Sequence, residues 1–171
     1  ESADRQESAG QQPQQAAPTA ADARQESADQ QAQPQQAAPA AAAAPARNII
    51  TVINNFANTV LNLTLRDVKI DVSDTGSYWV EGKAALSVQG KGNVEIELDG
   101  ENELKSGVQR AGLEKNTSEG TLTLKDDNKD GSLKATGGDS GAGIGGGVNG
   151  SGENITINGG SVTATGGKWA A

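Results

Sequence analysis

A short segment that recurs in the second part of the chain constrains the fold more than any other feature. "SLKATGG" begins at Ser132, "SVTATGG" begins 29 positions later at Ser161, and the related "ELKSG" begins 29 positions before Ser132, at Glu103. A repeat of this length, made of several short segments, is typical of a solenoid in which each round stacks on its neighbour.

Other segments follow the same repeat. One set is "VEIEL" (94–98), "TLTLK" (121–125) and "NITIN" (154–158), and another is "AGLEK" (111–115) with "AGIGG" (142–146). The longer runs place apolar residues at every second position, which is the period of a β-strand with one face turned inward. Gly and Asn clusters between the runs supply turns. An earlier, more divergent round is indicated by "LNLTL" (61–65), "VKIDV" (68–72) and "ALSV" (85–88).

These patterns predict an all-β fold over residues 48–171, a parallel β-helix of about four rounds. Parallel strands in register place equivalent residues one above another, so we expect Leu104, Leu133 and Val162 to form one inward-facing column. If the 29-residue register continued, Ala171 would fall in the middle of a round. From this we expect the parent protein to be longer than the 171 residues of this chain.

Residues 1–47 have a different composition from the rest. They contain all five prolines, a Gln/Ala/Pro-rich repeat ("RQESAGQQPQQAAP" from Arg5, "RQESADQQAQPQQAAP" from Arg24), and no Val, Ile, Leu, Phe, Trp or Tyr. Such a segment cannot bury enough apolar surface to offset the entropy of ordering it. We expect residues 1–47 to be a disordered linker.

The overall composition excludes several function classes. The net charge of −8 argues against nucleic-acid binding, because nothing attracts a phosphate backbone. The chain has no cysteine, so neither disulfides nor thiolate metal sites can form. No apolar run approaches the length of a membrane-spanning helix, so we expect no membrane insertion.

The segment "GGDSGAGIGGG" (137–147) contains two familiar motifs, the protease-like Gly138-Asp139-Ser140-Gly141 and a G-x-G-x-x-G pattern that begins at Gly141. A serine nucleophile of that type needs a neighbouring base, usually His, and the chain has no His. The dinucleotide motif needs a following helix, which "VNGSGENITING" cannot form. We interpret the glycines as a turn that recurs in each round.

The Gly-rich repeats "NVEIELDGENELKSG", "SLKATGGDSGAGIGGG" and "NITINGGSVTATGG" resemble those of adhesin-like or carbohydrate-binding parallel β-helix domains of bacterial cell-surface proteins. The resemblance covers about residues 48–171. It implies a secreted, surface-attached protein that binds polysaccharide or glycan and is not an enzyme. Some relatives in the wider β-helix group are similar in binding acidic polysaccharides with calcium.

A calcium site is predicted in "KDDNKDGS" (125–132). Asp126, Asn128 and Asp130, followed by Gly131, match the first half of a calcium loop, in which alternate oxygens face one cation. The twelfth position, where a bidentate Glu is required, is Gly137. The alternative is a polar turn. This turn is four residues longer than its counterpart in the next round, and the added residues are the acidic ones.

Ligand binding is predicted at Tyr78, Trp79 and Trp169. All three lie in turn-like segments, and flat rings stack on sugar faces while keeping a polar group in water. The alternative is that these rings cover an end or a side of the solenoid, whose terminal rounds need capping.

Three functions remain open from the sequence. The first is a non-enzymatic module that recognises glycans through loops beside its rounds, with or without calcium. The second is a structural stalk or spacer of a larger surface protein. The third is a polysaccharide lyase built on a β-helix, with Arg or Lys as base. Arg66 and Arg110 are the only arginines after residue 47, and neither has an obvious acidic partner cluster in the sequence.

Overall fold

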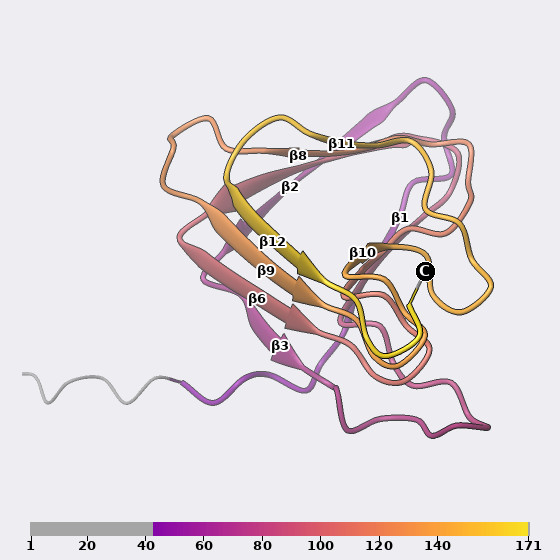
Figure 1. The fold of residues 1–171 in the computed structure, drawn as a ribbon. Helices are drawn as coiled ribbons and strands as arrows, with labels where there is room; N and C mark the ends of the chain where they lie inside the picture. Colours follow the sequence, from indigo (N-terminus) through magenta and orange to yellow (C-terminus); the bar gives the residue numbers. More distant parts are fainter. Residues whose placement is uncertain (1–42, 171) are drawn as a thin grey trace, which may run out of the picture. The chain divides into compact units, whose positions relative to one another are not determined.

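The structure, a computed structural model, describes residues 43–170. The chain winds into a coil whose walls are three parallel four-stranded sheets, seen roughly along the coil axis in Figure 1. Every ladder between consecutive rounds of the coil is parallel, as predicted. The predicted disordered linker lies outside the described residues, except for residues 43–47.

Each sheet takes one strand from each round. The first sheet contains β1 (Ile50–Ile53), β4 (Leu86–Gln89), β7 (Leu113–Glu114) and β10 (Ile144–Gly145). The second contains β2 (Val60–Arg66), β5 (Asn93–Asp99), β8 (Leu122–Lys125) and β11 (Ile155–Ile157). The third contains β3 (Lys69–Asp71), β6 (Glu101–Lys105), β9 (Ser132–Thr136) and β12 (Ser161–Thr165). Within residues 43–170 no helix is long and apolar enough to cross a membrane.

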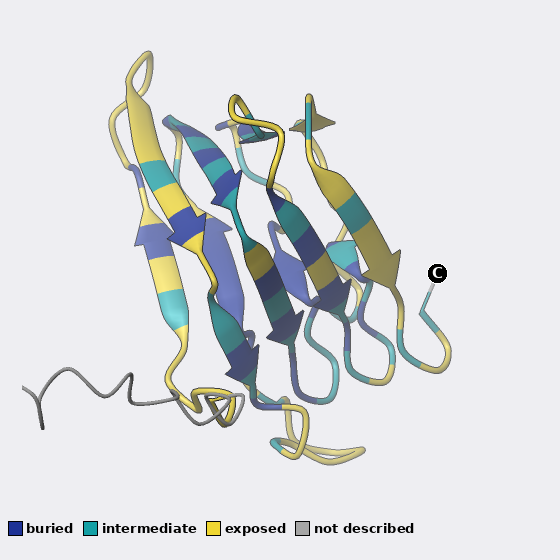
Figure 2. Ribbon diagram, turned by 90° about the vertical axis from the view of Figure 1, so that its left-hand side faces the viewer, coloured by how far each residue is buried: buried dark blue, intermediate teal, exposed yellow. Residues whose placement is uncertain are grey.

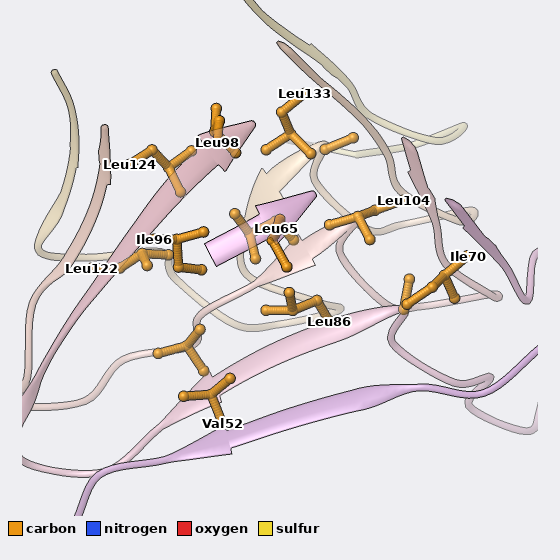
Figure 3. Packing of buried hydrophobic residues seen from close by; sticks show 14 of the residues in the cluster. Val52, Leu65, Ile70, Leu86, Ile96, Leu98, Leu104, Leu122, Leu124 and Leu133 are labelled. Atoms are coloured by element: carbon orange, nitrogen blue, oxygen red, sulfur yellow. The ribbon is translucent and has the colours of Figure 1, made fainter. Parts of the chain in front are cut away.

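The core fills the inside of the coil. In β5 the apolar residues alternate with half-buried polar residues, so one face of the strand is completely enclosed. Figure 3 shows Leu86, Ile96 and Leu104, one from each sheet, with their side chains directed into this interior. Enclosing one such side chain contributes about 1.5–3 kcal/mol, so the stacked aliphatic columns hold the rounds together.

The predicted column in the third sheet is partly wrong. Leu133 pairs with Val162 as expected, but the residue of β6 that pairs with Leu133 is Asn102. Leu104 lies one inward position further on, in the column of Ala135.

The cause is the length of one turn. Glu97 pairs with Lys125 across 28 positions, whereas Glu101 pairs with Ser132 across 31, so the turn between β8 and β9 holds three residues more than the turn between β5 and β6. A slip of two residues keeps the same side chains inward, and the hydrophobic pattern therefore does not reveal it.

Asn102 replaces packing with hydrogen bonds that tie three rounds together. Its Oδ1 accepts from the backbone N–H of Val68 at 2.9 Å, in the round before. Its Nδ2 donates to the carbonyls of Asp99 and of Ser132, both at 3.1 Å. The side chain is almost fully buried, so it pairs the N–H of Val68 and gives a further donor to the carbonyl of Asp99, which also accepts from the N–H of Asp67 at 3.2 Å.

The first part of the segment "GGDSGAGIGGG", residues 137–143, forms a turn that recurs in the solenoid, as predicted, and Ile144 and Gly145 then form β10. Gln109, Ser140 and Trp169 occupy equivalent places in successive rounds, and all have a left-handed backbone, with φ of 67°, 63° and 59°. A Cβ on Gly138 would lie 2.0 Å from the carbonyl oxygen of Gly107 in the turn below. Glycine is therefore required there by the close approach of two backbones.

The first described residues already join the coil. Ala46 forms a parallel bridge with Ile70 of β3, and Arg47 donates to Asp74 at 2.6 Å. These contacts fall within the segment that the sequence assigned to the linker. At the other end, β12 is mostly exposed because no described round packs on it (Figure 2).

Candidate functional site

Four turns stack along one edge of the coil and form a continuous surface, which we call the turn edge: residues 73–85, 106–112, 137–143 and 166–170. Val108 donates its N–H to the carbonyl of Thr75 at 3.0 Å, Gln109 to that of Asp139 at 2.7 Å, and Ser140 to that of Lys168 at 2.6 Å. The four turns lie side by side at the lower edge of Figure 2. Backbone hydrogen bonds between rounds make this edge rigid.

Tyr78 and Trp79 project from the first turn of this edge. A tight hairpin, closed by hydrogen bonds between Ser77 and Val80, places the two residues at its tip. Their rings meet edge to face with centroids 4.7 Å apart. Gln109 in the next turn donates its side-chain amide to the carbonyl of Tyr78 at 3.0 Å and anchors the hairpin. With 76% and 88% of their surfaces exposed, the rings cover no part of the core.

Trp169 lies on the last turn of the same edge and is 76% exposed. Three turn spacings of about 4.8 Å separate its round from that of Trp79, or about 14 Å along the coil axis. Trp169 also borders a hollow of about 750 Å³ at the C-terminal end of the described coil, together with Ile144 and Ile155. The structure thus brings the three predicted ligand residues to one edge, at its two ends, without joining them in a single cluster.

Arg110, in the second turn of the edge, does have acidic partners. Its guanidinium donates to Glu81 at 3.0 Å and lies 2.7 Å from Glu114, one partner in the turn below and one four residues ahead in β7. The Nε of Arg110 is buried and has no partner among the described residues. This group was not predicted from the sequence. The separation of Arg110 and Glu81, 29 positions, equals the repeat length and was the available signal, whereas a four-residue spacing to Glu114 indicates a contact only in a helix.

Glu114 is the buried member of this group, with 3% of its surface exposed. Its carboxylate also accepts from the backbone N–H of Ala111 at 3.1 Å and from the amide of Asn116 at 3.4 Å. Burial raises the pKa of the Glu114 carboxyl above its ordinary value, and the charge of Arg110 opposes that rise. A carboxylate held in this way remains a strong hydrogen-bond acceptor.

Lys115 is also buried, in the inward column that continues from Val52 and Val88 of the first sheet. Its Nζ donates to Ser118 Oγ at 2.8 Å. Burial lowers the pKa of Lys115, and the charge of Glu153 opposes that shift. A lysine in an otherwise aliphatic column was not predicted from the sequence.

The predicted calcium loop forms the turn between β8 and β9. Its four extra residues relative to the next round are confirmed, since Leu124 pairs with Ile157 across 33 positions and Ser132 with Ser161 across 29. Asn128 and Asp130 are exposed at the tip, and Asp126 is half-buried.

The acceptors around this turn do not form a complete ligand set. Asp126 Oδ1 and Glu97 Oε2 are each buried without a hydrogen-bond partner in the described part of the chain. The other oxygen of Glu97 accepts from the N–H of Asp127 at 2.7 Å. Over residues 43–170 no three His, Cys, Asp or Glu side chains converge as a metal site would require. Calcium binding at Asp126, Asn128 and Asp130 therefore stays a prediction, with Asp126 the residue that best fits it.

Comparison with known proteins gives one match. A family model described as a beta helix repeat matches residues 129–148 and 155–171, which contain β9, the last strand of the third round, and the three strands of the fourth round. No curated protein and no solved structure matches the chain. The match and the structure together support a parallel β-helix domain.

Proposed function

We propose that residues 43–170 are a non-enzymatic, adhesin-like carbohydrate-binding module of an extracellular cell-surface protein, and that the turn edge receives a glycan chain. The observation that carries this proposal is the exposure of Tyr78, Trp79 and Trp169 along one rigid edge. Exposed rings on a fixed scaffold present flat apolar faces to sugars at little entropic cost. Stacked rounds also provide an extended surface, which suits a polymer better than a small molecule.

The test is a glycan array probed with the chain and with three variants. The double variant Tyr78→Ala/Trp79→Ala and the single variant Trp169→Ala are each expected to weaken binding about tenfold, or about 1.4 kcal/mol. Phe56→Ala is the matched control, because Phe56 is equally exposed but lies at the corner between β1 and β2. Equal binding by all four proteins would contradict the proposed site.

A structural stalk or spacer is the second candidate. Its support is the outer face of the third sheet, where Lys69, Glu103 and Lys134 stack in alternating charge. Such a ladder stabilises the coil without presenting a ligand surface. A chain that binds nothing on the array, yet unfolds cooperatively and behaves as a rigid rod in scattering, would favour the stalk over the binding module.

Lyase activity is the weakest candidate, since Arg110 is held between two carboxylates and is poorly placed to act as a free base. New unsaturated ends on pectin-like polymers incubated with the chain would nevertheless demonstrate it and overturn the non-enzymatic proposal.

Calcium is proposed to assist binding through the turn at Asp126. An unpartnered buried carboxylate oxygen carries a desolvation cost that a divalent cation would relieve. Millimolar calcium is then expected to raise the melting temperature of the wild type and not that of Asp126→Asn/Asp130→Asn. Asp139→Asn, a change at an exposed residue on the turn edge, is the control. The same rise in all three proteins would show that calcium acts elsewhere.

A further inference from the structure

A polar pocket of about 320 Å³ lies on the outer face of the first sheet, next to the turn edge. Its floor is formed by Ser87 and Glu114, which are paired neighbours on β4 and β7 and point away from the core. In the next round the equivalent of Glu114 is Gly145, which has no side chain to fill the space. The volume is at the lower end of the range for small-molecule sites.

The walls of the pocket are almost entirely hydrogen-bonding groups. Arg110 forms the side nearest the turn edge, and the opposite side comes from Gln89 and from the turn after β7, at Asn116, Thr117 and Ser118. The floor is enclosed, since Ser87 is 5% and Glu114 is 3% exposed. The buried Nε of Arg110 has no partner within residues 43–170. A buried donor without a partner is a group that an ordered water or a ligand acceptor would satisfy.

The charges around the pocket select the class of ligand. Among the residues that line the pocket Arg110 is the one cation, and it is shared between Glu81 and Glu114. An anionic ligand would therefore compete with two carboxylates for the guanidinium. Lys115 lies behind Ser118 with its side chain fully buried, and it cannot extend to a ligand. A neutral ligand with several hydroxyls can both donate to Glu114 and accept from Arg110, Asn116 and Gln89.

We infer that this pocket binds one neutral sugar residue of the glycan chain whose other residues lie on the turn edge. The inference rests on the proposed carbohydrate-binding function and names its substrate class: neutral rather than uronic-acid polysaccharide. The Glu81–Arg110–Glu114 group connects the two surfaces, since Glu81 follows the Tyr78–Trp79 hairpin and Glu114 forms the pocket floor. The aromatic pair supplies stacking, and the pocket supplies the hydrogen bonds that distinguish one sugar from another.

The experiment begins with the glycan array and continues with variants against its strongest binder. Ser87→Val adds a larger side chain at the floor and so reduces the volume of the pocket. The change is compatible with β4, because β-branched residues suit strands. Thr51→Val is its matched control: Thr51 lies directly below Ser87 in the same outward column, and the change removes the hydroxyl that accepts from Ser87 at 3.5 Å but leaves every residue that lines the pocket in place. Glu114→Gln keeps an acceptor for the N–H of Ala111 and removes the charge.

NMR shifts of the Arg110 Nε–H and of the Asn116 amide report on the pocket, and the two indole N–H signals report on the turn edge.

Neutral glycans are expected to dominate the array. Ser87→Val and Glu114→Gln should each lose at least tenfold in affinity, Thr51→Val should bind as the wild type, and the ligand should shift the Arg110 and Asn116 signals. Binding that shifts only the indole signals and survives Ser87→Val would overturn the pocket while leaving the turn edge intact. A predominance of acidic glycans would overturn the substrate class. A chain that binds no glycan would overturn the proposed function itself.

Discussion

Strands β9 and β12 have nearly the same sequence and different surroundings. "SLKAT" in β9 buries Leu133 and Ala135 almost completely, whereas "SVTAT" in β12 leaves Val162 half-buried and Ala164 exposed. The two strands pair with each other in register, and only β9 has a described round on both sides. Burial in this fold therefore depends on the neighbouring rounds more than on the strand's own residues, as expected for a quasi-one-dimensional architecture.

The most sensitive test of this comparison is one pair of truncations. Leu133→Ala is expected to cost about 2–5 kcal/mol in the free energy of unfolding, because Leu133 is enclosed and its removal leaves a cavity. Val162→Ala in the same column should cost about 1 kcal/mol or less, since water already reaches Val162. Urea denaturation of both variants measures the difference. Equal losses would show that the two rounds are covered alike.

Asn102 pairs with Leu133 and occupies the same inward column with a polar side chain. Asn102→Ala should cost about 1–3 kcal/mol, because the N–H of Val68 loses its buried acceptor and the carbonyls of Asp99 and Ser132 each lose a donor. Asn62→Ala, at an exposed outward position of β2, should cost almost nothing. If Asn102→Leu proved more stable than the wild type, the position would be a packing site like that of Leu133.

Replacing Lys115 should raise the free energy of unfolding, whereas replacing Leu133 or Asn102 lowers it. Lys115→Met restores an apolar side chain to the column of Val52 and Val88, and we expect it to stabilise the fold by about 1 kcal/mol or more. Because burial lowers the pKa of Lys115, the folded state disfavours the charged amine. The gain should therefore be full at neutral pH and shrink as the pH rises toward the pKa of a free lysine. Melting curves at pH 7 and pH 10 measure this, with the exposed Lys134→Met as control. If the stability gained by Lys115→Met does not change with pH, the amine of Lys115 stays hydrated in the folded state.

The smallest effect on stability should come from the aromatic residues of the turn edge. Trp169→Ala and Tyr78→Ala/Trp79→Ala are expected to change the free energy of unfolding by less than about 0.5 kcal/mol, because these rings are exposed. A loss of 2 kcal/mol or more in either would show that the rings cap the coil, which is the structural alternative to ligand binding.

The architecture was predictable from the sequence because strand period and repeat are local patterns. The runs at 94–98, 121–125 and 154–158 stack as predicted, and the glycine-rich turn after β9 recurs as expected. The position of Asn102 was not predictable, since the longer turn before Ser132 shifts the register by two residues without changing which face is apolar. Arg110 and Glu81 are 29 positions apart and meet only because two turns stack. Such contacts between rounds depend on register, which the apolar pattern alone does not define.

The most direct test of glycan binding at the turn edge uses the two tryptophans of the chain. Trp169→Phe leaves Trp79 as the one tryptophan, and Trp79→Phe leaves Trp169, so each end of the edge can be followed separately with excitation that Tyr78 does not absorb. Titrated with the strongest glycan from the array, both single-tryptophan proteins should show a saturable change in emission with similar apparent affinity, together with protection from acrylamide quenching. Binding that leaves the emission and the quenching of both tryptophans unchanged would contradict the assignment of the turn edge as the glycan site.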